Sequence, residues 1–287
     1  MKVVTDAAAN LPAEKAARLG VEVAPFQVTF LGKTYKDGID IHPEDLYRMY
    51  IENPNDFVST SQPSVGDFVT AYEKCGSEED IISVHLSSGL SGAYSSAAHA
   101  AQMVPNRSIT VIDSLTVGPA LGWMVETAAQ GIQLNWSKER IIAAMQLVRD
   151  NTITMVTFSD LKHLIHSGRV NHLKSIFASI LKIKPIIGMN SQDGRYSNVG
   201  QEMTVTRAIR KMVGKVHERF GDQKLRVQLM HGSNLPGVDQ LREIVNEMLD
   251  VNEDPLVPVT LVLGAHAGPT VIGIAAAPQA IFDQLFV

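Results

Sequence analysis

The chain has 287 residues, of which 45% are hydrophobic, 19% are charged and 6% are aromatic, and its formal net charge is -5. This composition is typical of a soluble globular protein and excludes an intrinsically disordered chain. A mild negative charge without a long basic run argues against a nucleic-acid-binding protein. The length allows one large or two medium domains, and we expect two.

Cysteine content and motif spacing exclude several kinds of site. Cys75 is the only cysteine, so an intramolecular disulfide and a cysteine-based zinc cluster are both impossible. The sequence has neither an H-E-x-x-H pair nor an EF-hand loop, and we expect no bound metal. Gly32-Lys33-Thr34 resembles the end of a phosphate-binding loop, but Gln27 occupies the position of its first glycine, so no nucleotide site is predicted.

The start of the chain bears on localisation. The strand-like run Val3-Val4-Thr5 is not preceded by the apolar region of a signal peptide. No uninterrupted apolar stretch reaches the roughly 18 residues that a membrane-spanning helix needs. We expect a cytoplasmic protein that has at most transient contact with membranes.

Strand-like and helix-like segments alternate through the first half, which is the pattern of βαβ units around a parallel sheet. The predicted elements are a strand at 3–5, a helix at 12–19, an extended segment at 21–30 with a hairpin turn at Gly32-Lys33, helices at 43–50 and 64–74, a strand at 81–84, a helix at 93–104, a strand at 109–112 and a helix at 120–130. This order predicts a doubly wound sheet.

The second half is richer in aliphatic residues. We predict helices at 137–151, 205–220 and 238–250, strands at 155–158, 226–230 and 261–263, and an aliphatic-rich segment at 161–189. The predicted fold class is therefore α/β with two domains. Residues 1–160 form an N-terminal domain with a doubly wound parallel sheet, and residues 161–287 form a second α/β domain.

The run from Val84 to Tyr94, which reads VHLSSGLSGAY, is a candidate anion site. It links a predicted buried strand to a predicted helix, so its serines and glycines would place free N–H groups and hydroxyls at a helix N-terminus. A carboxylate or a phosphate would be stabilised there by the helix dipole. The alternative is a serine-capped helix whose glycines only permit a tight turn.

A second hydroxyl cluster precedes the helix predicted at 64–74. Pro63 restricts Gln62 to an extended conformation, so Thr60 and Ser61 would lie in a rigid loop that suits ligand oxygens. Ser64 is explained as the helix cap. Capping does not explain Thr60 and Ser61.

The third candidate element is His266, in Gly264-Ala265-His266-Ala267-Gly268-Pro269 after the strand predicted at 261–263. A histidine among small residues at the end of a buried strand can donate a hydrogen bond to an anion or act as a general base. A purely structural histidine is the alternative. Ser91, Asp113 and His266 also occur in the chain order of a serine hydrolase triad, although Asp113 follows Ser91 too closely for that fold.

Taken together, these motifs resemble the DegV family, the bacterial fatty-acid-binding proteins that serve as the lipid-carrying subunit of fatty acid kinase. The resemblance spans nearly the whole chain. It rests on Val4-Thr5-Asp6 with Asn10-Leu11-Pro12, Thr60-Ser61-Gln62-Pro63-Ser64, Ser87-Ser88-Gly89-Leu90-Ser91-Gly92-Ala93-Tyr94, Val111-Ile112-Asp113-Ser114, Ser167-Gly168-Arg169-Val170, Leu181-Lys182-Ile183-Lys184-Pro185 and His266-Ala267-Gly268-Pro269.

The resemblance implies a protein that holds one long-chain fatty acid in an apolar tunnel between its two domains, without a cofactor. Carboxylate recognition would fall to Thr60 or Ser61, to Ser91 with the Gly92 amide, and to His266. The acyl chain would lie against aliphatic side chains, for which the candidates are Val28, Ile176, Ile180, Ile183 and Ile186. Arg169 would neutralise the head group or contact a partner, and a structural ion pair explains it equally well.

By the same resemblance the protein is not an enzyme. A separate ATP-dependent kinase subunit related to dihydroxyacetone kinases would phosphorylate the bound carboxylate to an acyl phosphate. Two other functions stay open. One is a serine esterase that uses Ser91 and His266, and the other is a lipid sensor without a kinase partner, because Gln201 and Met203 replace a Lys-x-Arg pair that the family associates with kinase docking.

Overall fold

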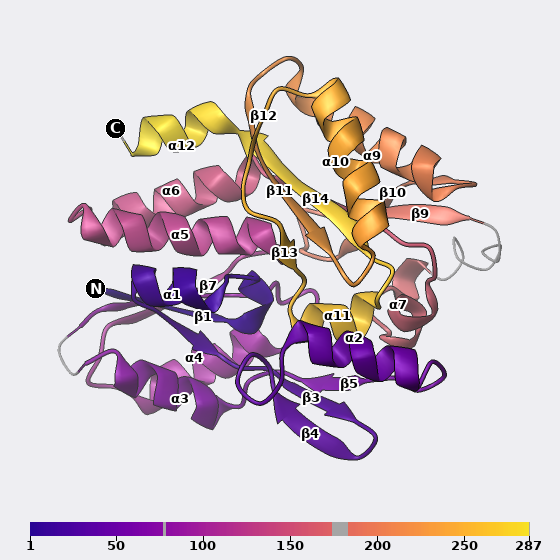
Figure 1. Ribbon diagram of the computed structural model, residues 1–287. Coiled ribbons are helices and arrows are strands. Elements are labelled where there is room, and N and C mark those ends of the chain that lie inside the picture. Colours follow the sequence, from indigo (N-terminus) through magenta and orange to yellow (C-terminus); the bar gives the residue numbers. More distant parts are fainter. Residues whose placement is uncertain (77–78, 174–182, 287) are drawn as a thin grey trace. The chain divides into compact units, whose positions relative to one another are not determined.

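The computed structural model describes residues 1–76, 79–173 and 183–286 (Figure 1). The chain divides into two compact units, each of which is assembled from three segments. Unit 1 comprises Met1–His42, Thr60–Asp150 and Ser191–Arg195, and unit 2 comprises Pro43–Ser59, Asn151–Asn190 and Tyr196–Val287. The expected domains, 1–160 and 161–287, are continuous in sequence, whereas the two compact units are interleaved.

Unit 1 is built on a parallel sheet of four strands in the order β2-β1-β6-β7. The strands are β1 (Lys2–Asp6), β2 (Val21–Ala24), β6 (Ile81–His85) and β7 (Ile109–Asp113). All three strand pairs are parallel. Every residue of β6 is buried, which is usual for a central strand covered by helices on both faces.

Helices cover both faces of this sheet. The helices α1 (Ala13–Leu19) and α5 (Pro119–Gln133) lie on one side, and α3 (Val65–Lys74) and α4 (Ala93–Met103) lie on the other (Figure 1). Helix α6 (Lys138–Asp150) packs against α5. The doubly wound parallel sheet predicted from the alternating pattern is therefore confirmed.

A small antiparallel hairpin also belongs to the first part of the chain. The strands β3 (Gln27–Phe30) and β4 (Lys33–Lys36) are joined by Leu31 and Gly32, which both have positive φ, as a tight two-residue turn requires. The short strand β5 (Ser59–Ser61) completes the three-stranded sheet in the order β4-β3-β5. The prediction that Thr60 and Ser61 lie in a loop is wrong, because both belong to β5.

Unit 2 is built on a mixed sheet in the order β10-β9-β8-β14-β11-β12, with β13 paired to β11. Its strands are β8 (Ile153–Thr157), β9 (Lys184–Met189), β10 (Tyr196–Glu202), β11 (Leu225–His231), β12 (Val251–Glu253), β13 (Val257–Pro258) and β14 (Ile272–Pro278). Neighbours are antiparallel from β10 to β11, and β11 is parallel to β12 and β13. Helices α9 (Val205–Phe220) and α10 (Leu235–Met248) pack on this sheet and bury the core of the unit.

The remaining helices of unit 2 are α2 (Pro43–Glu52), α7 (Lys162–His166), α11 (Leu261–Ala267) and α12 (Gln279–Leu285), together with the 3-10 turn η2 (Asn171–Leu173). Helix α11 contacts both α2 and α7. The strand predicted at 261–263 is wrong, because these residues start α11. A short apolar run does not by itself distinguish a buried strand from a buried helix.

Candidate functional site

The turn after β6 is held by its own hydrogen bonds. The six amides from Leu86 to Ser91 all donate within the chain, over distances of 3.0 or 3.1 Å. Three of them donate to distant residues: Leu86 to Asp6 Oδ2, Ser87 to the Thr116 carbonyl and Ser88 to Asp113 Oδ1. The other three donate to Ser87: Gly89 to its Oγ, and Leu90 and Ser91 to its carbonyl. The prediction of free N–H groups in this run therefore does not hold for residues 86–91. An anion meets donors only further along, where α4 begins.

Two glycines of this turn region are required by packing. The Ser87 hydroxyl donates to the Gly194 carbonyl over 2.7 Å, so residues 191–195 lie against the turn. A Cβ atom on Gly194 would be 2.0 Å from Ser87 Oγ, and one on Gly89 would be 2.6 Å from the Asp193 carbonyl oxygen. Both distances are too short for any side chain. These glycines therefore permit the close approach of two backbone segments.

Two carboxylates anchor the turn to the neighbouring strands. Asp6, at the end of β1, accepts from the amides of Ala8 and Leu86. Asp113, at the end of β7, accepts from the amides of Ser88 and Leu115 through one oxygen. Asp113 therefore has a structural explanation at this position and is not needed as the acid of a hydrolase triad.

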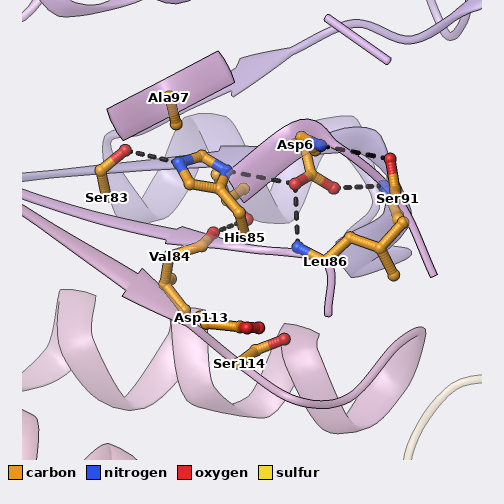
Figure 2. A network of polar contacts seen from close by, with 12 residues as sticks. Asp6, Ser83, Val84, His85, Leu86, Ser91, Ala97, Asp113 and Ser114 are labelled. Carbon is orange, nitrogen blue, oxygen red and sulfur yellow. Dashed lines mark hydrogen bonds and ion pairs between the residues drawn. The ribbon is translucent and has the colours of Figure 1, made fainter. Parts of the chain in front are cut away.

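Asp6 also lies at one end of a buried network of hydrogen bonds that was not predicted from the sequence (Figure 2). His85 Nδ1 lies 3.1 Å from Asp6 Oδ2, and His85 Nε2 lies 2.5 Å from Ser83 Oγ. Tyr72 Oη lies 2.9 Å from Ser83 Oγ and donates to the Ala97 carbonyl. Ser83 and His85 alternate along β6, so they share one face of the strand. That spacing, in a run otherwise apolar, is the signal that could have revealed them.

Open donors gather at the start of α4. The first helical hydrogen bond runs from the Ser96 amide to the Gly92 carbonyl. Among the residues that the structure describes, the amides of Gly92, Tyr94 and Ser95 have no acceptor, as is usual for a first helical turn. Ser91 Oγ accepts from the Ala93 amide over 3.2 Å, which leaves the hydroxyl proton free to donate. Ser91 and Gly92 thus present hydrogen-bond donors at the positive end of a helix.

The segment that carries Thr60 and Ser61 lies beside this helix start. A Cβ atom on Gly92 would be 2.8 Å from Nε2 of Gln62, so the Gln62 side chain covers that glycine. Ser61 is exposed and Thr60 is half-buried. Gln62 was not predicted as a site residue, although it brings the segment with Thr60 and Ser61 next to Gly92. Ser64 forms a capping box with Asp67, as predicted for a helix cap.

In unit 2, His266 lies in the last turn of α11 and is partly buried. The pKa of His266 is lowered to about 3, mainly by burial and also by the positive charge of Arg169. The imidazole is therefore neutral at neutral pH. A neutral imidazole offers one N–H donor and one acceptor nitrogen.

Arg169 lies near enough to His266 for their charges to interact. Its Nη1 donates to the Ser167 carbonyl over 2.7 Å, and burial lowers the pKa of the guanidinium. In the described part of the chain, no carboxylate forms an ion pair with Arg169. Its positive charge is therefore available for an anion.

The predicted acyl-lining residues have different surroundings. Val28 is buried in β3, and Ile183 is half-buried just before β9. Ile186 is fully buried in the core cluster that α9 contributes to. Ile176 and Ile180 lie outside the described residues.

In the described ranges, no group of three or more His, Cys, Asp or Glu side chains is arranged to hold a metal ion. None of the helices in the same ranges combines the length and the apolar character needed to cross a bilayer.

Comparison with known proteins places the chain in a family. It matches the family model described as "Uncharacterised protein, DegV family" over residues 1–279. A DegV domain-containing protein of Staphylococcus aureus is 34% identical over 274 residues, which cover 95% of this chain and 96% of the relative. A DegV domain-containing protein of Deinococcus radiodurans is 32% identical over 279 residues, which cover 97% and 96%.

Two solved structures share the fold over nearly their whole length. One, described by its fatty acid binding, is a DegV family protein from Thermus thermophilus, with a TM-score of 0.88 and 27% identity over 97% of this chain and 99% of the other. The other is DegV from Bacillus subtilis, described as a fatty acid binding protein, with a TM-score of 0.85 and 28% identity over 97% and 99%. On the evidence of both its sequence and its fold, this chain belongs to the DegV family.

Proposed function

We propose that this protein binds a long-chain fatty acid and is not itself a catalyst. The observation that carries the proposal is the donor set at the start of α4, where the Ser91 hydroxyl and the Gly92 amide are both open. The similarity to the proteins of T. thermophilus and B. subtilis, which are described as fatty acid binding, supports the same ligand class.

A carboxylate suits these donors for electrostatic reasons. Hydrogen bonds to a charged acceptor are about twice as strong as those between neutral groups, and the N-terminus of α4 adds the positive end of a helix dipole. We assign the carboxylate to Ser91, to the Gly92 amide, to His266 and to one of Thr60 and Ser61. His266 donates its single N–H as a neutral imidazole.

Arg169 supplies long-range charge compensation in this proposal. Its cation has no acidic partner in the described ranges, and it lies close enough to His266 to affect the pKa of that histidine. A bound carboxylate would be attracted by the guanidinium and would accept from the imidazole. We therefore assign Arg169 to the head group.

The apolar part of the ligand would supply most of the affinity, because each buried methylene contributes about 0.8 kcal/mol. Val28 and Ile183 remain candidates to contact it. Ile186 is a weaker candidate, because its side chain belongs to the core cluster of unit 2.

The direct test of the proposed function is mass spectrometry of the protein purified from cells under native conditions. A co-purifying fatty acid at close to one molecule per chain is the expected result. Replacement of Ser91 by Ala together with His266 by Ala should lower its occupancy. A wild-type protein that is reproducibly empty and does not take up added palmitate would overturn the proposal.

We further propose that the bound fatty acid is presented to a separate ATP-dependent kinase subunit, which would phosphorylate the carboxylate. The lipid sensor is the competing function, because Gln201 and Met203 are both exposed and uncharged near the end of β10. Acyl phosphate formation in a mixture of this protein, palmitate, ATP and a kinase subunit from the same organism separates the two functions. Turnover supports the carrier, and its absence with the protein fully loaded supports the sensor.

A further inference from the structure

The carbonyl of Ala265 is one of the carbonyls at the end of α11 that have no helical donor. The last hydrogen bond of the helix runs from the Gly268 amide to the Gly264 carbonyl over 2.8 Å. The carbonyl of Ala265 would next accept from residue 269, but residue 269 is proline and has no N–H. Ala265 is buried, so water does not readily replace the missing donor.

A tyrosine from α2 supplies the missing donor. Tyr50 Oη donates to the Ala265 carbonyl over 3.1 Å, and both residues are buried. Burial raises the pKa of Tyr50 far above its ordinary value, so the hydroxyl keeps its proton. The residue next to Ala265 is His266, whose peptide nitrogen belongs to the same peptide group as that carbonyl. The Tyr50 hydroxyl thus fixes the peptide plane that carries His266.

Two glycines on α11 meet neighbouring rings on either side of this contact. A Cβ atom on Gly264 would be 2.7 Å from Tyr47 Oη, and one on Gly268 would be 2.5 Å from Cδ2 of His163. The rings of Tyr50 and His163 are in contact, with centroids 4.3 Å apart. Three side chains from α2 and α7 therefore lie against the helix turn that carries His266. They are Tyr47 at Gly264, Tyr50 at Ala265 and His163 at Gly268.

We propose that Tyr50 is a positioning residue for His266. This inference rests on the proposed function, in which His266 donates to the ligand carboxylate. Without the Tyr50 hydroxyl, the Ala265 carbonyl can accept a hydrogen bond only from water, and the end of α11 must shift toward solvent to reach it. The imidazole then moves away from its binding position. The Gly-Pro pair after His266 fits this arrangement, because Gly268 leaves room for His163 and Pro269 has no N–H that could replace the Tyr50 hydroxyl.

The first test does not involve a ligand. The Tyr50→Phe variant keeps the ring on His163 and removes only the hydroxyl. The pKa of His266, followed by its imidazole NMR signals during a pH titration, is expected to rise by about one unit or more as the site becomes hydrated. Tyr72→Phe is the matched control, since its hydroxyl also donates to a buried carbonyl over 3.1 Å, and it should leave the His266 titration unchanged. An unchanged His266 titration in Tyr50→Phe would overturn the inference.

The second test is a double-mutant cycle on palmitate affinity, measured by calorimetry. Tyr50→Phe is expected to weaken binding about fivefold to tenfold in the wild-type background and to have no further effect in the His266→Ala background. An equal loss in both backgrounds would show that Tyr50 acts independently of His266 and would overturn the inference. If wild-type protein binds no palmitate, the proposed function fails, and the titration of His266 still decides the positioning role.

Discussion

Asp6 Oδ2 accepts a hydrogen bond of 3.0 Å from the backbone amide of Leu86, and the side chains of both residues are buried. Asp6 ends β1, and Leu86 directly follows the neighbouring parallel strand β6. Asp6 therefore fixes where the chain leaves β6 for the turn that leads to Ser91. The same oxygen faces His85, and the other oxygen caps η1 (Ala7–Ala9) through the Ala8 amide (Figure 2).

This relationship predicts the effect of Asp6→Asn. An asparagine keeps one oxygen, but its NH2 group must face the amide of either Leu86 or Ala8, which leaves a buried donor unsatisfied. The free energy of unfolding in urea should fall by about 1–3 kcal/mol. Asp45→Asn is the control, because Asp45 forms an exposed ion pair with Arg48, and its loss should cost less than about 1 kcal/mol. Equal losses in the two variants would contradict the role assigned to Asp6.

Gly194 provides a second prediction. Gly194→Ala combines a backbone φ of 64° with a Cβ atom 2.0 Å from Ser87 Oγ, whereas Gly32→Ala has a similar φ of 78° and no atom within 4 Å. Both variants carry backbone strain of about 1 kcal/mol, but only Gly194→Ala must also displace residues 191–195 from the turn.

Hydrogen exchange is the measurement for this pair. The amides of residues 87–91 should exchange faster in Gly194→Ala than in wild type, and they should be unaffected in Gly32→Ala. If exchange at these amides rises equally in both variants, global destabilisation explains the result and the close backbone approach does not.

The periodic parts of the fold were predictable from sequence. The alternation of apolar strands with amphipathic helices predicted the parallel sheet of unit 1, and α3 and α9 begin and end near the predicted residues. Apolar spacing carries this information because it decides which face of an element is buried. The interleaving of the two units could not be predicted in this way, since no local pattern shows that Pro43–Ser59 belongs with the second half of the chain.

The candidate site was only partly predictable. Ser91 and Gly92 were found because a serine-glycine turn before a helix has a local signature. The use of the six amides from Leu86 to Ser91 was not foreseen, because three of them donate to acceptors on Asp6, Thr116 and Asp113, which lie far away in sequence. His266 was proposed from its small neighbours, but its place on a helix and the hydrogen bond from Tyr50 to the neighbouring Ala265 carbonyl depend on tertiary packing.

The lowered pKa of His163 predicts how the free energy of unfolding depends on pH. The pKa of His163 is lowered to about 4, mainly by burial and also by the nearby charge of Lys162, against the opposing effect of Asp160. The unfolded chain, with an ordinary histidine pKa of 6.5, therefore binds more protons than the folded chain between about pH 4 and 6.5. The free energy of unfolding must fall as the pH falls through this window, by up to about 3 kcal/mol for this residue.

The measurement is urea unfolding of wild type and His163→Gln at several pH values from 7 to 4. His163→Gln should lower stability at pH 7 through lost packing on Tyr50 and Phe57, and its stability should change less steeply with pH than that of wild type. Parallel pH profiles would show that His163 is not the group that titrates on unfolding.

Substitution of Ser91 distinguishes a protein that binds a carboxylate from a serine esterase. Ser91→Ala removes one hydroxyl donor at the start of α4 and should weaken palmitate binding by about tenfold or more, because a hydrogen bond to a charged group contributes about 1.5–3 kcal/mol. Ser88→Ala is the matched control, since its side chain is exposed while its amide is held by Asp113, and it should bind palmitate like wild type. A fluorophosphonate probe should label neither wild type nor either variant, because the Ser91 hydroxyl oxygen accepts from the Ala93 amide and, among the described residues, forms no hydrogen bond with a histidine or a carboxylate that could act as a general base. Labelling that disappears in Ser91→Ala would instead make Ser91 a nucleophile and the protein an esterase.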